Sequence, residues 1–179
     1  MAGRMRGFTL VEFMVTVAVL GIVLGLGVPG FAALSERMRT LNALHLLTAS
    51  LAQARMEAIR RNALVAACPS ADGLRCTEGV AWEGGWILFT DPARLGRPRS
   101  REDVLQVFEP IGPGLRLRAT SGRRLVRFTP NGWSAGSNVS IRLCGKPGAP
   151  GRLLAAVIVN NAGRIRSERP ETAAPCPFG

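Results

Sequence analysis

The chain has 179 residues, of which 47% are hydrophobic, and its formal net charge is +11 at pH 7. This length is enough for one globular domain in addition to an N-terminal apolar segment. The sequence contains no internal repeat and no low-complexity array, which excludes a repeat architecture.

The positive charge is concentrated in the second half of the chain. Residues 8–90 contain six basic and six acidic residues, whereas residues 91–179 contain fifteen basic and six acidic residues, a net charge of +9. Such an excess favours an anionic partner, nucleic acid or lipid headgroups, over a role in solubility alone. Because 22 of the 23 basic residues are arginine, a bias that genome composition also produces, the positions of the arginines are more informative than their number.

The first predicted element is a long apolar helix near the N-terminus. From Phe8 to Leu34, 27 residues contain a single charged residue, Glu12. At a rise of ~1.5 Å per residue this helix would be about 40 Å long, enough to cross a bilayer core of ~30 Å. The seven preceding residues carry two arginines, and the apolar run lies wholly after Gly7. Cleavage after Gly7 would therefore leave the hydrophobic segment on the mature chain, unlike cleavage of a secretory signal peptide.

The junction Gly7-Phe8-Thr9-Leu10-Val11-Glu12 resembles the processing site of type IV pilins and type II secretion pseudopilins. The resemblance implies that a prepilin peptidase cuts after Gly7 and methylates the new N-terminal Phe8. It also implies that Glu12 pairs with the amine of a neighbouring subunit during assembly. A carboxylate in a membrane span costs ~2.5 kcal/mol or more, so it needs such a partner. The alternative is an ordinary signal anchor that contains a glutamate.

Four segments follow from this resemblance. We expect a leader peptide at residues 1–7, a transmembrane and assembly helix at 8–34, the amphipathic second half of the helix at 35–62, and a β-rich globular domain at 63–179. The N-terminal arginines favour the cytoplasm. The chain should therefore cross the inner membrane once, with its globular domain in the periplasm, before assembly into a pilus or other extracellular filament. The implied partners are the prepilin peptidase and other pilins or pseudopilins.

The helix is predicted to continue beyond the membrane and to end at Asn62. An interruption is expected at Val28-Pro29-Gly30, because proline removes one helical hydrogen bond and kinks the axis. Spacings of three and four predict an amphipathic face that packs on a sheet. His45 on this face is expected to be half-buried and not catalytic. The residues of the predicted face are Leu34, Met38, Leu41, His45, Thr48, Ala52, Met56 and Ile59.

After the helix, short β-type runs alternate with turn signals. The alternation of apolar and basic residues in Leu115-Arg116-Leu117-Arg118 and Ile141-Arg142-Leu143 indicates an antiparallel sheet with one face against a core and the other in solvent. Turns are predicted at Pro130-Asn131-Gly132, Lys146-Pro147-Gly148 and Asn160-Asn161-Ala162-Gly163. The predicted strands are Leu64–Cys68, Gly85–Thr90, Val104–Phe108, Leu115–Ala119, Leu125–Thr129, Val139–Cys144 and Leu153–Val159.

Four cysteines follow the apolar segment, and export to an oxidising compartment favours disulfides. Four cysteines allow three connectivities. Cys68 and Cys76 bracket a short loop, which favours a local bridge, and Cys144 and Cys176 would then attach the Pro-rich tail to the sheet. A zinc site is the alternative. It is disfavoured because the sequence has no C-x-x-C pair and its only histidine is in a predicted helix.

Two further segments resemble one branch of the pilin superfamily, the GspH/FimT pseudopilins and minor pilins. Gly85-Trp86-Ile87-Leu88-Phe89-Thr90-Asp91 is similar to the G-W-x-x-F-x-D segment of that branch, and residues 157–166 resemble the strand–turn–G-R-x-R segment of FimT minor pilins. Residues 92–125 carry no such resemblance. The implied fold is α+β, the type IV pilin fold, in which a long N-terminal helix, transmembrane in its first half, packs on an antiparallel β-sheet domain.

The G-R-x-R segment is the predicted DNA-binding site. In FimT minor pilins the arginines of this motif, with basic residues nearby, are implicated in binding DNA for natural transformation. Gly163 can supply the positive φ of a tight turn. Arg164 and Arg166, two apart on an extended segment, point to the same side. With Arg169 close by, they would bind adjacent phosphates through charge-assisted hydrogen bonds.

Double-stranded DNA, bound without sequence preference, is the predicted ligand. Phosphate contacts carry affinity but little base information. Aromatic side chains for stacking single strands are few in this half of the chain, namely Phe108, Phe128, Trp133 and Phe178. Two alternatives remain. In the first, the arginines are only the solvated face of an edge strand. In the second, the chain is a type II secretion minor pseudopilin with a structural role in a periplasmic filament.

Enzyme chemistry is not expected. The sequence has no G-x-S-x-G, no P-loop and no His–Glu metal pattern. We therefore predict no enzymatic activity, no cofactor and no metal site.

Overall fold

The computed structural model describes residues 9–134, 136, 138–145, 151–172 and 174–178, and the chain divides into two units between Arg39 and Thr40. Within these residues one helix, α1, is followed by eight strands, with a short 3-10 helix at Arg101–Asp103. The elements are α1 (Leu10–Arg61), β1 (Val65–Pro69), β2 (Trp86–Thr90), β3 (Val104–Phe108), β4 (Leu115–Ala119), β5 (Val126–Phe128), β6 (Val139–Gly145), β7 (Leu153–Val159) and β8 (Ile165–Glu168).

The first unit contains the apolar part of α1. The helix begins after Thr9, whose Oγ1 accepts the Glu12 N–H at 3.2 Å, so Thr9 is its N-cap. Residues Leu10–Val28 are long and apolar enough to cross a membrane. The helix continues through Val28–Gly30 without a break, so the predicted interruption is wrong as a break in the helix, while the kink of the axis stays a prediction. A proline removes a single backbone hydrogen bond, and the flanking turns retain theirs.

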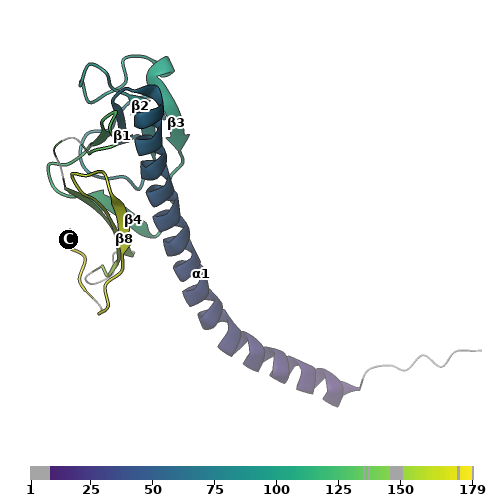
Figure 1. Cartoon of the computed structure of the whole chain (residues 1–179). Helices are drawn as coiled ribbons and strands as arrows, with labels where there is room; N and C mark the ends of the chain where they lie inside the picture. The colour runs from purple at the N-terminus through teal and green to yellow at the C-terminus, as the bar shows by residue number, and fades with distance from the viewer. Residues whose placement is uncertain (1–8, 135, 137, 146–150, 173, 179) are drawn as a thin grey trace, which may run out of the picture. The chain divides into compact units, whose positions relative to one another are not determined.

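The second unit contains the rest of α1 and two four-stranded antiparallel sheets (Figure 1). The strand order is β3-β2-β1-β5 in the first sheet and β4-β6-β7-β8 in the second. The α+β class and all seven predicted strands are confirmed, with ends that differ by at most one residue, and β8 is an additional strand. The single sheet suggested by the sequence is in fact two. The predicted turn at residues 146–148 lies outside the described residues.

The helix packs on the sheets through a different face from the one predicted. Residues of the predicted face are exposed: His45, Met56 at 62% and Ile59 at 45%. The buried face contains many small side chains, which let the helix lie close to the strands. One of them, Ser50, accepts the indole N–H of the buried Trp86 at 3.0 Å. The buried residues of this face are Ala43, Leu44, Leu47, Ser50, Leu51, Ala54 and Ala58.

The two sheets differ in how they are covered. In β4, Leu115, Leu117 and Ala119 are buried while the arginines between them are half-buried, which confirms the predicted alternation. In contrast, β1 is buried at every position and β2 at all but the last. A second apolar cluster lies on the outer side of the first sheet, made by Ala66, Cys68, Ile87 and Phe89 with Cys76, Val104 and Leu125 around it. Among the described strands, the alternation of a buried and a solvent-facing side is therefore clearest in the second sheet, while the first sheet is exposed mainly along β3.

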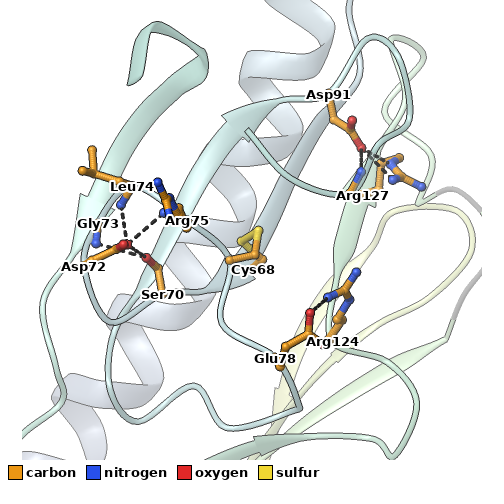
Figure 2. Close-up of a disulfide and its surroundings, with 12 residues drawn as sticks. Cys68, Ser70, Asp72, Gly73, Leu74, Arg75, Glu78, Asp91, Arg124 and Arg127 are labelled. Carbon is orange, nitrogen blue, oxygen red and sulfur yellow. Dashed lines mark hydrogen bonds and ion pairs between the residues drawn. A yellow bond between two sulfur atoms is a disulfide. The ribbon is translucent and has the colours of Figure 1, made fainter. Parts of the chain in front are cut away.

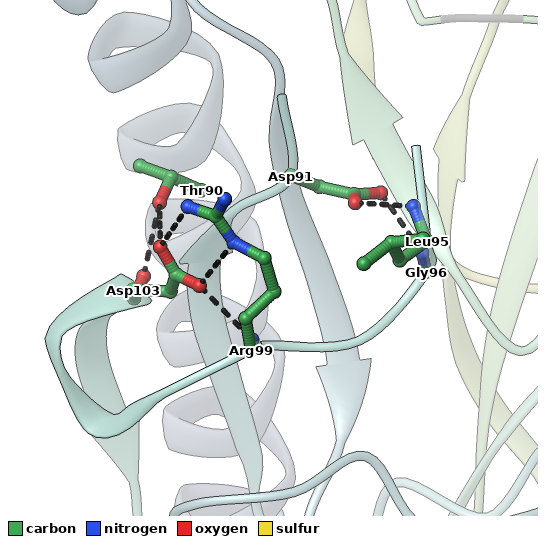
Figure 3. Close-up of polar contacts among 6 residues, drawn as sticks. All are labelled: Thr90, Asp91, Leu95, Gly96, Arg99 and Asp103. Carbon is green, nitrogen blue, oxygen red and sulfur yellow. Dashed lines mark hydrogen bonds and ion pairs between the residues drawn. The ribbon is translucent and has the colours of Figure 1, made fainter. Parts of the chain in front are cut away.

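Two aspartates anchor the loop after β2. Asp91 is 2% exposed and accepts hydrogen bonds from the backbone N–H groups of Leu95 and Gly96 (Figure 3). It also pairs with Arg127 of β5 at 2.6 Å (Figure 2). Asp91 is the last residue of the G-W-x-x-F-x-D segment. This segment therefore has a structural role, because its carboxylate ties the loop to the first sheet.

The second anchor is Asp103. Its carboxylate accepts the Arg99 backbone N–H at 2.9 Å and two hydrogen bonds from the Arg99 guanidinium, each at 3.1 Å (Figure 3). The guanidinium and backbone N–H of Arg99 hold the pKa of the Asp103 carboxyl well below its usual range.

Candidate nucleic-acid interface

The candidate interface begins at the turn between β7 and β8. The Gly163 N–H donates to the Asn160 carbonyl oxygen at 2.9 Å, and the Arg164 N–H donates to Asn160 Oδ1 at 2.8 Å. Gly163 has a φ of +72°, in the left-handed region that favours glycine. Asn160 therefore closes the turn, Gly163 permits it, and Arg164 stands directly before β8.

A second turn, which precedes Ser134, packs against the first. A Cβ at Gly163 would lie 1.9 Å from the carbonyl oxygen of Gly132, and the Ser134 N–H donates to the Asn161 carbonyl at 3.0 Å. Arg55 of α1 lies against both turns, since its Nε is 3.3 Å from the Cβ position at Gly163 and 3.1 Å from that at Gly132. Two turns distant in sequence thus form one joined edge on the helix.

The arginines of the predicted site lie on the free edge of the second sheet. Among the described strands, β8 pairs only with β7. Ile165 packs on the core, so Arg164 and Arg166 point to the opposite side, as the alternation of a strand requires. Both are exposed, as is Arg169 beyond the end of the strand.

The charges of this edge are partly compensated. Arg166 pairs with Glu168 at 3.0 Å on the same face of the strand. For the Arg164 side chain, the described residues provide no ion-pair partner. Arg164 is therefore the less compensated of the two guanidinium groups.

The strand register brings further arginines to the same face. Arg118 pairs with Arg142, Arg142 with Ala156, and Ile158 with Arg166. Residues paired across an antiparallel sheet point to the same side. Arg116 lies two residues from Arg118 and shares this face. The outer face of the second sheet therefore contains Arg116, Arg118, Arg142 and Arg166. The sequence analysis found the alternation in β4 and β6 but did not assign these arginines to the site.

Carboxylates neutralise this face only in part. Arg118 contacts Glu83 at 3.5 Å, a long ion pair, and its guanidinium lies 5.8 Å from the centre of the Phe178 ring. Arg116 and Arg142 have no carboxylate partner among the described residues. Arg118 and Arg142 are directly opposite on neighbouring strands, where like charges repel. An anion on this face would relieve that repulsion.

The C-terminal tail is held beside this face. Cys144 and Cys176 form a disulfide with a Cα–Cα distance of 6.0 Å, and the Leu153 N–H donates to the Ala174 carbonyl at 2.9 Å. Cys68 and Cys76 form the other disulfide, which closes the loop beside the first sheet (Figure 2). Both pairs are those expected from the sequence.

A second basic region lies in a groove between the Cys76 loop and the loop at residues 95–99. Arg75, Arg97, Arg99 and Arg124 line it. Here carboxylates are close, because Arg124 pairs with Glu78 at 3.2 Å (Figure 2) and Arg99 pairs with Asp103. Two of its four arginines are paired, as are two of the four on the sheet face, but the groove does not contain the G-R-x-R segment and is therefore the second candidate for an anion.

The predicted processing site is described only in part. Gly7 and Phe8 lie outside the described residues. Glu12 is exposed in the first turn of α1. Within the described part of the chain, no group of three or more His, Cys, Asp or Glu residues could hold a metal ion.

An apolar N-terminal helix followed by a helix-packed pair of antiparallel sheets is the type IV pilin fold. The crystal structure of the type IV minor pilin FimU of Pseudomonas aeruginosa (strain PAO1) in space group P21 matches with a TM-score of 0.59 at 22% identity, over 79% of this chain and 96% of that one. FimU in space group P65 matches with a TM-score of 0.55 at 20% identity, over 75% and 96%.

Sequence comparisons agree with the fold. The family described as type II transport protein GspH matches residues 43–163, and the prokaryotic N-terminal methylation motif matches residues 3–28. The pilin-like protein PilA1 of Thermus thermophilus is 30% identical over 169 residues, 91% of this chain and 98% of the relative. The chain therefore belongs to the GspH family of type IV pilin-like proteins, and its role is that of a minor pilin or pseudopilin. The resemblance found in the sequence is confirmed.

Proposed function

We propose that this minor pilin binds duplex DNA through its phosphate backbone, without sequence preference, in a pilus that takes up DNA for natural transformation. The observation that carries the proposal is the position of Arg164 and Arg166. They lie at an exposed sheet edge, on the same face as Arg116, Arg118 and Arg142.

The dimensions of this face suit a nucleic-acid backbone. Strands are ~4.8 Å apart and rise ~3.3 Å per residue, so Arg142 and Arg166, two strands and two residues apart, are separated by about 12 Å. One DNA strand carries a phosphate every ~3.4 Å along the helix axis. A span of about 12 Å along the helix axis therefore covers about four phosphates of one strand. Guanidinium groups bind these oxygens through charge-assisted, often bidentate hydrogen bonds.

The test is a titration of the full chain in neutral detergent with a labelled duplex across a salt series. Arg164→Ala should weaken binding by roughly 1–3 kcal/mol for unrelated sequences, and the slope of log K against log salt should become shallower by about one. Arg166→Ala should have a smaller effect because Glu168 already compensates this charge. Glu168→Gln should strengthen binding.

Arg60→Ala is the matched control. Its side chain is 65% exposed and lies at the end of α1, where it pairs with Glu57. It should leave the affinity for DNA almost unchanged. A double Arg164→Ala, Arg166→Ala variant that binds duplex as tightly as wild type at moderate salt would show that these arginines are only a solvated face.

A structural role in a type II secretion filament is the second candidate. It is favoured by the match of residues 43–163 to a family described as a type II transport protein. Deletion of the gene separates the two functions. Loss of secretion with normal DNA uptake supports the filament role, and the reverse supports DNA binding.

Membrane topology and maturation complete the proposal. Cleavage after Gly7 would expose Phe8 for N-methylation and leave Glu12 near the new amine. The domain would then lie in the periplasm, anchored in the inner membrane by the apolar part of α1 until assembly. This is supported by the methylation motif at residues 3–28 and by the apolar helix Leu10–Val28.

A further inference from the structure

An exposed tryptophan, Trp133, lies in the turn that packs against the β7–β8 turn, the turn that precedes Arg164 and Arg166. Trp133 is 57% exposed, whereas Trp82 and Trp86 are completely buried. The turn that carries it is well closed, because the Thr129 N–H donates to the Trp133 carbonyl at 2.8 Å and the Trp133 N–H donates to Asn131 Oδ1 at 3.3 Å. A large aromatic surface is thus held in solvent by an ordered backbone.

A shallow, open groove lies along this ring and reaches the β7–β8 turn. It is lined by uncharged residues: Thr129, Pro130, Asn131, Trp133, Ser134, Gly136 and Asn161. Asn161 belongs to the β7–β8 turn and accepts the Ser134 N–H at 3.0 Å. The groove therefore lies between the two joined turns. Asn161, which lines it, is three residues before Arg164 in the sequence.

We propose that this groove binds an unpaired nucleobase, stacked on Trp133, from a single-stranded segment or frayed end of DNA. The inference rests on the proposed function, because the arginines of the hairpin would hold the phosphates on either side of the base. Every base has a flat π surface, so stacking on an aromatic side chain is tolerant of sequence. The amides of Asn131 and Asn161 can bind the edges of a base.

The charge arrangement favours a nucleic acid over a neutral ligand such as a sugar. The groove itself is neutral, and its neighbour Arg164 has no carboxylate partner among the described residues. The neutral aromatic surface matches the apolar faces of nucleobases. The positive charge beside it matches the anionic backbone of the same strand. In an intact duplex the bases are stacked on each other and cannot reach the ring.

Intrinsic fluorescence tests the proposal directly, since Trp133 is the exposed member of the three tryptophans in the chain. The full chain in neutral detergent is titrated with a 20-nucleotide oligothymidine and, separately, with a duplex of equal length. Oligothymidine should quench the emission and protect Trp133 from iodide, whereas duplex should do so much less. Trp133→Ala should weaken oligothymidine binding about tenfold or more and duplex binding less than twofold. Trp133→Phe should retain part of the binding.

The outcomes separate this inference from the proposed function. If Arg164→Ala weakens duplex binding while Trp133→Ala leaves oligothymidine binding unchanged, the base-binding groove is rejected and the phosphate interface stands. If Trp133→Ala weakens both ligands equally, the ring has no special role for unpaired bases and the inference also fails. Quenching by a neutral maltooligosaccharide, without any response to oligothymidine, would identify a sugar site instead. If neither DNA ligand binds, both proposals fall. Emission from Trp82 and Trp86 reports that the variants are folded.

Discussion

At the scale of single residues, the candidate interface depends most directly on the packing around Gly163. It needs a positive φ, and it also needs the absence of a side chain, because the Gly132 carbonyl occupies the space of a Cβ. A positive φ and the absence of a side chain are separate requirements, and another glycine of the chain has only the first of them. Gly122 has a φ of +74° but no atom within 4 Å of its Cβ position.

Gly163→Ala should therefore destabilise the protein more than Gly122→Ala. The control carries only the backbone strain of a left-handed alanine, about 1–2 kcal/mol. Gly163→Ala adds a backbone clash that separates the two turns, so we expect a further loss of at least about 1 kcal/mol. Urea denaturation measures both. Equal losses would mean that the contact between the turns is unimportant.

Asp103 makes stability depend on pH in the acid range. In the folded chain Arg99 lowers its pKa, while in the unfolded chain it titrates near its ordinary value of about 3.9. The stabilisation is therefore fully present above about pH 5 and is lost as the pH falls through and below 4. The difference in unfolding free energy between wild type and Asp103→Asn should be constant from pH 5 to 7 and shrink toward pH 3. A difference that does not change with pH would contradict this assignment.

At the scale of elements, the second sheet and the tail are joined by a long covalent loop. The Cys144–Cys176 bridge spans 32 residues, and Cys68–Cys76 spans eight. In the chain-entropy model, stabilisation grows with the logarithm of the loop length. The fourfold difference in length corresponds to about 1 kcal/mol.

Removing Cys144–Cys176 by a double serine substitution should therefore cost about 1 kcal/mol more than removing Cys68–Cys76. Chemical denaturation of the two double variants under oxidising conditions gives the comparison. Peptide mapping without reductant checks that the remaining bridge is intact in each. A larger loss for the Cys68 and Cys76 variant would show that packing around β1, and not loop entropy, dominates.

At the scale of the whole molecule, the chain combines an apolar helix for assembly with a domain that presents charge. The methylation motif matches residues 3–28, and the GspH family matches residues 43–163. Together these two matches cover both functional parts of a minor pilin. We propose that the first part brings a subunit into a filament and that the second determines what the filament contacts.

The mature protein should begin at Phe8 with one added methyl group. Intact-mass measurement of protein extracted from peptidase-competent membranes tests this. Gly7→Val should block the cut, because the peptidase accepts glycine before the cleaved bond in the proteins that this site resembles. Glu12→Ala should be cut normally but enter filaments poorly, since the amine of the neighbouring subunit loses its partner. Protein that retains residues 1–7 in such cells would refute the processing site.

The sequence predicted the strands well but not which face of α1 is buried. Alternation in β4 and β6 depends on neighbouring residues, so it can be read locally. The helix from Thr40 to Arg61 has apolar side chains on more than one side. Large ones such as Met56 and Ile59 gave the stronger pattern, yet the buried positions include Ala54 and Ala58. The helix lies close to the strands, so small side chains fit on its buried face. The sheets set the distance between helix and strands.

The sequence by itself determined the apolar helix, the helix end at Asn62, the positions of the strands and the resemblance to pilins, because each depends on local pattern. Only the tertiary structure decided that Arg118 lies opposite Arg142, that Arg166 shares their face, and that the Trp133 turn rests on Gly163. These relations depend on strand register and on contacts between distant segments. Hydrogen bonds and packing between strands fix them, and no stretch of sequence taken alone contains that information.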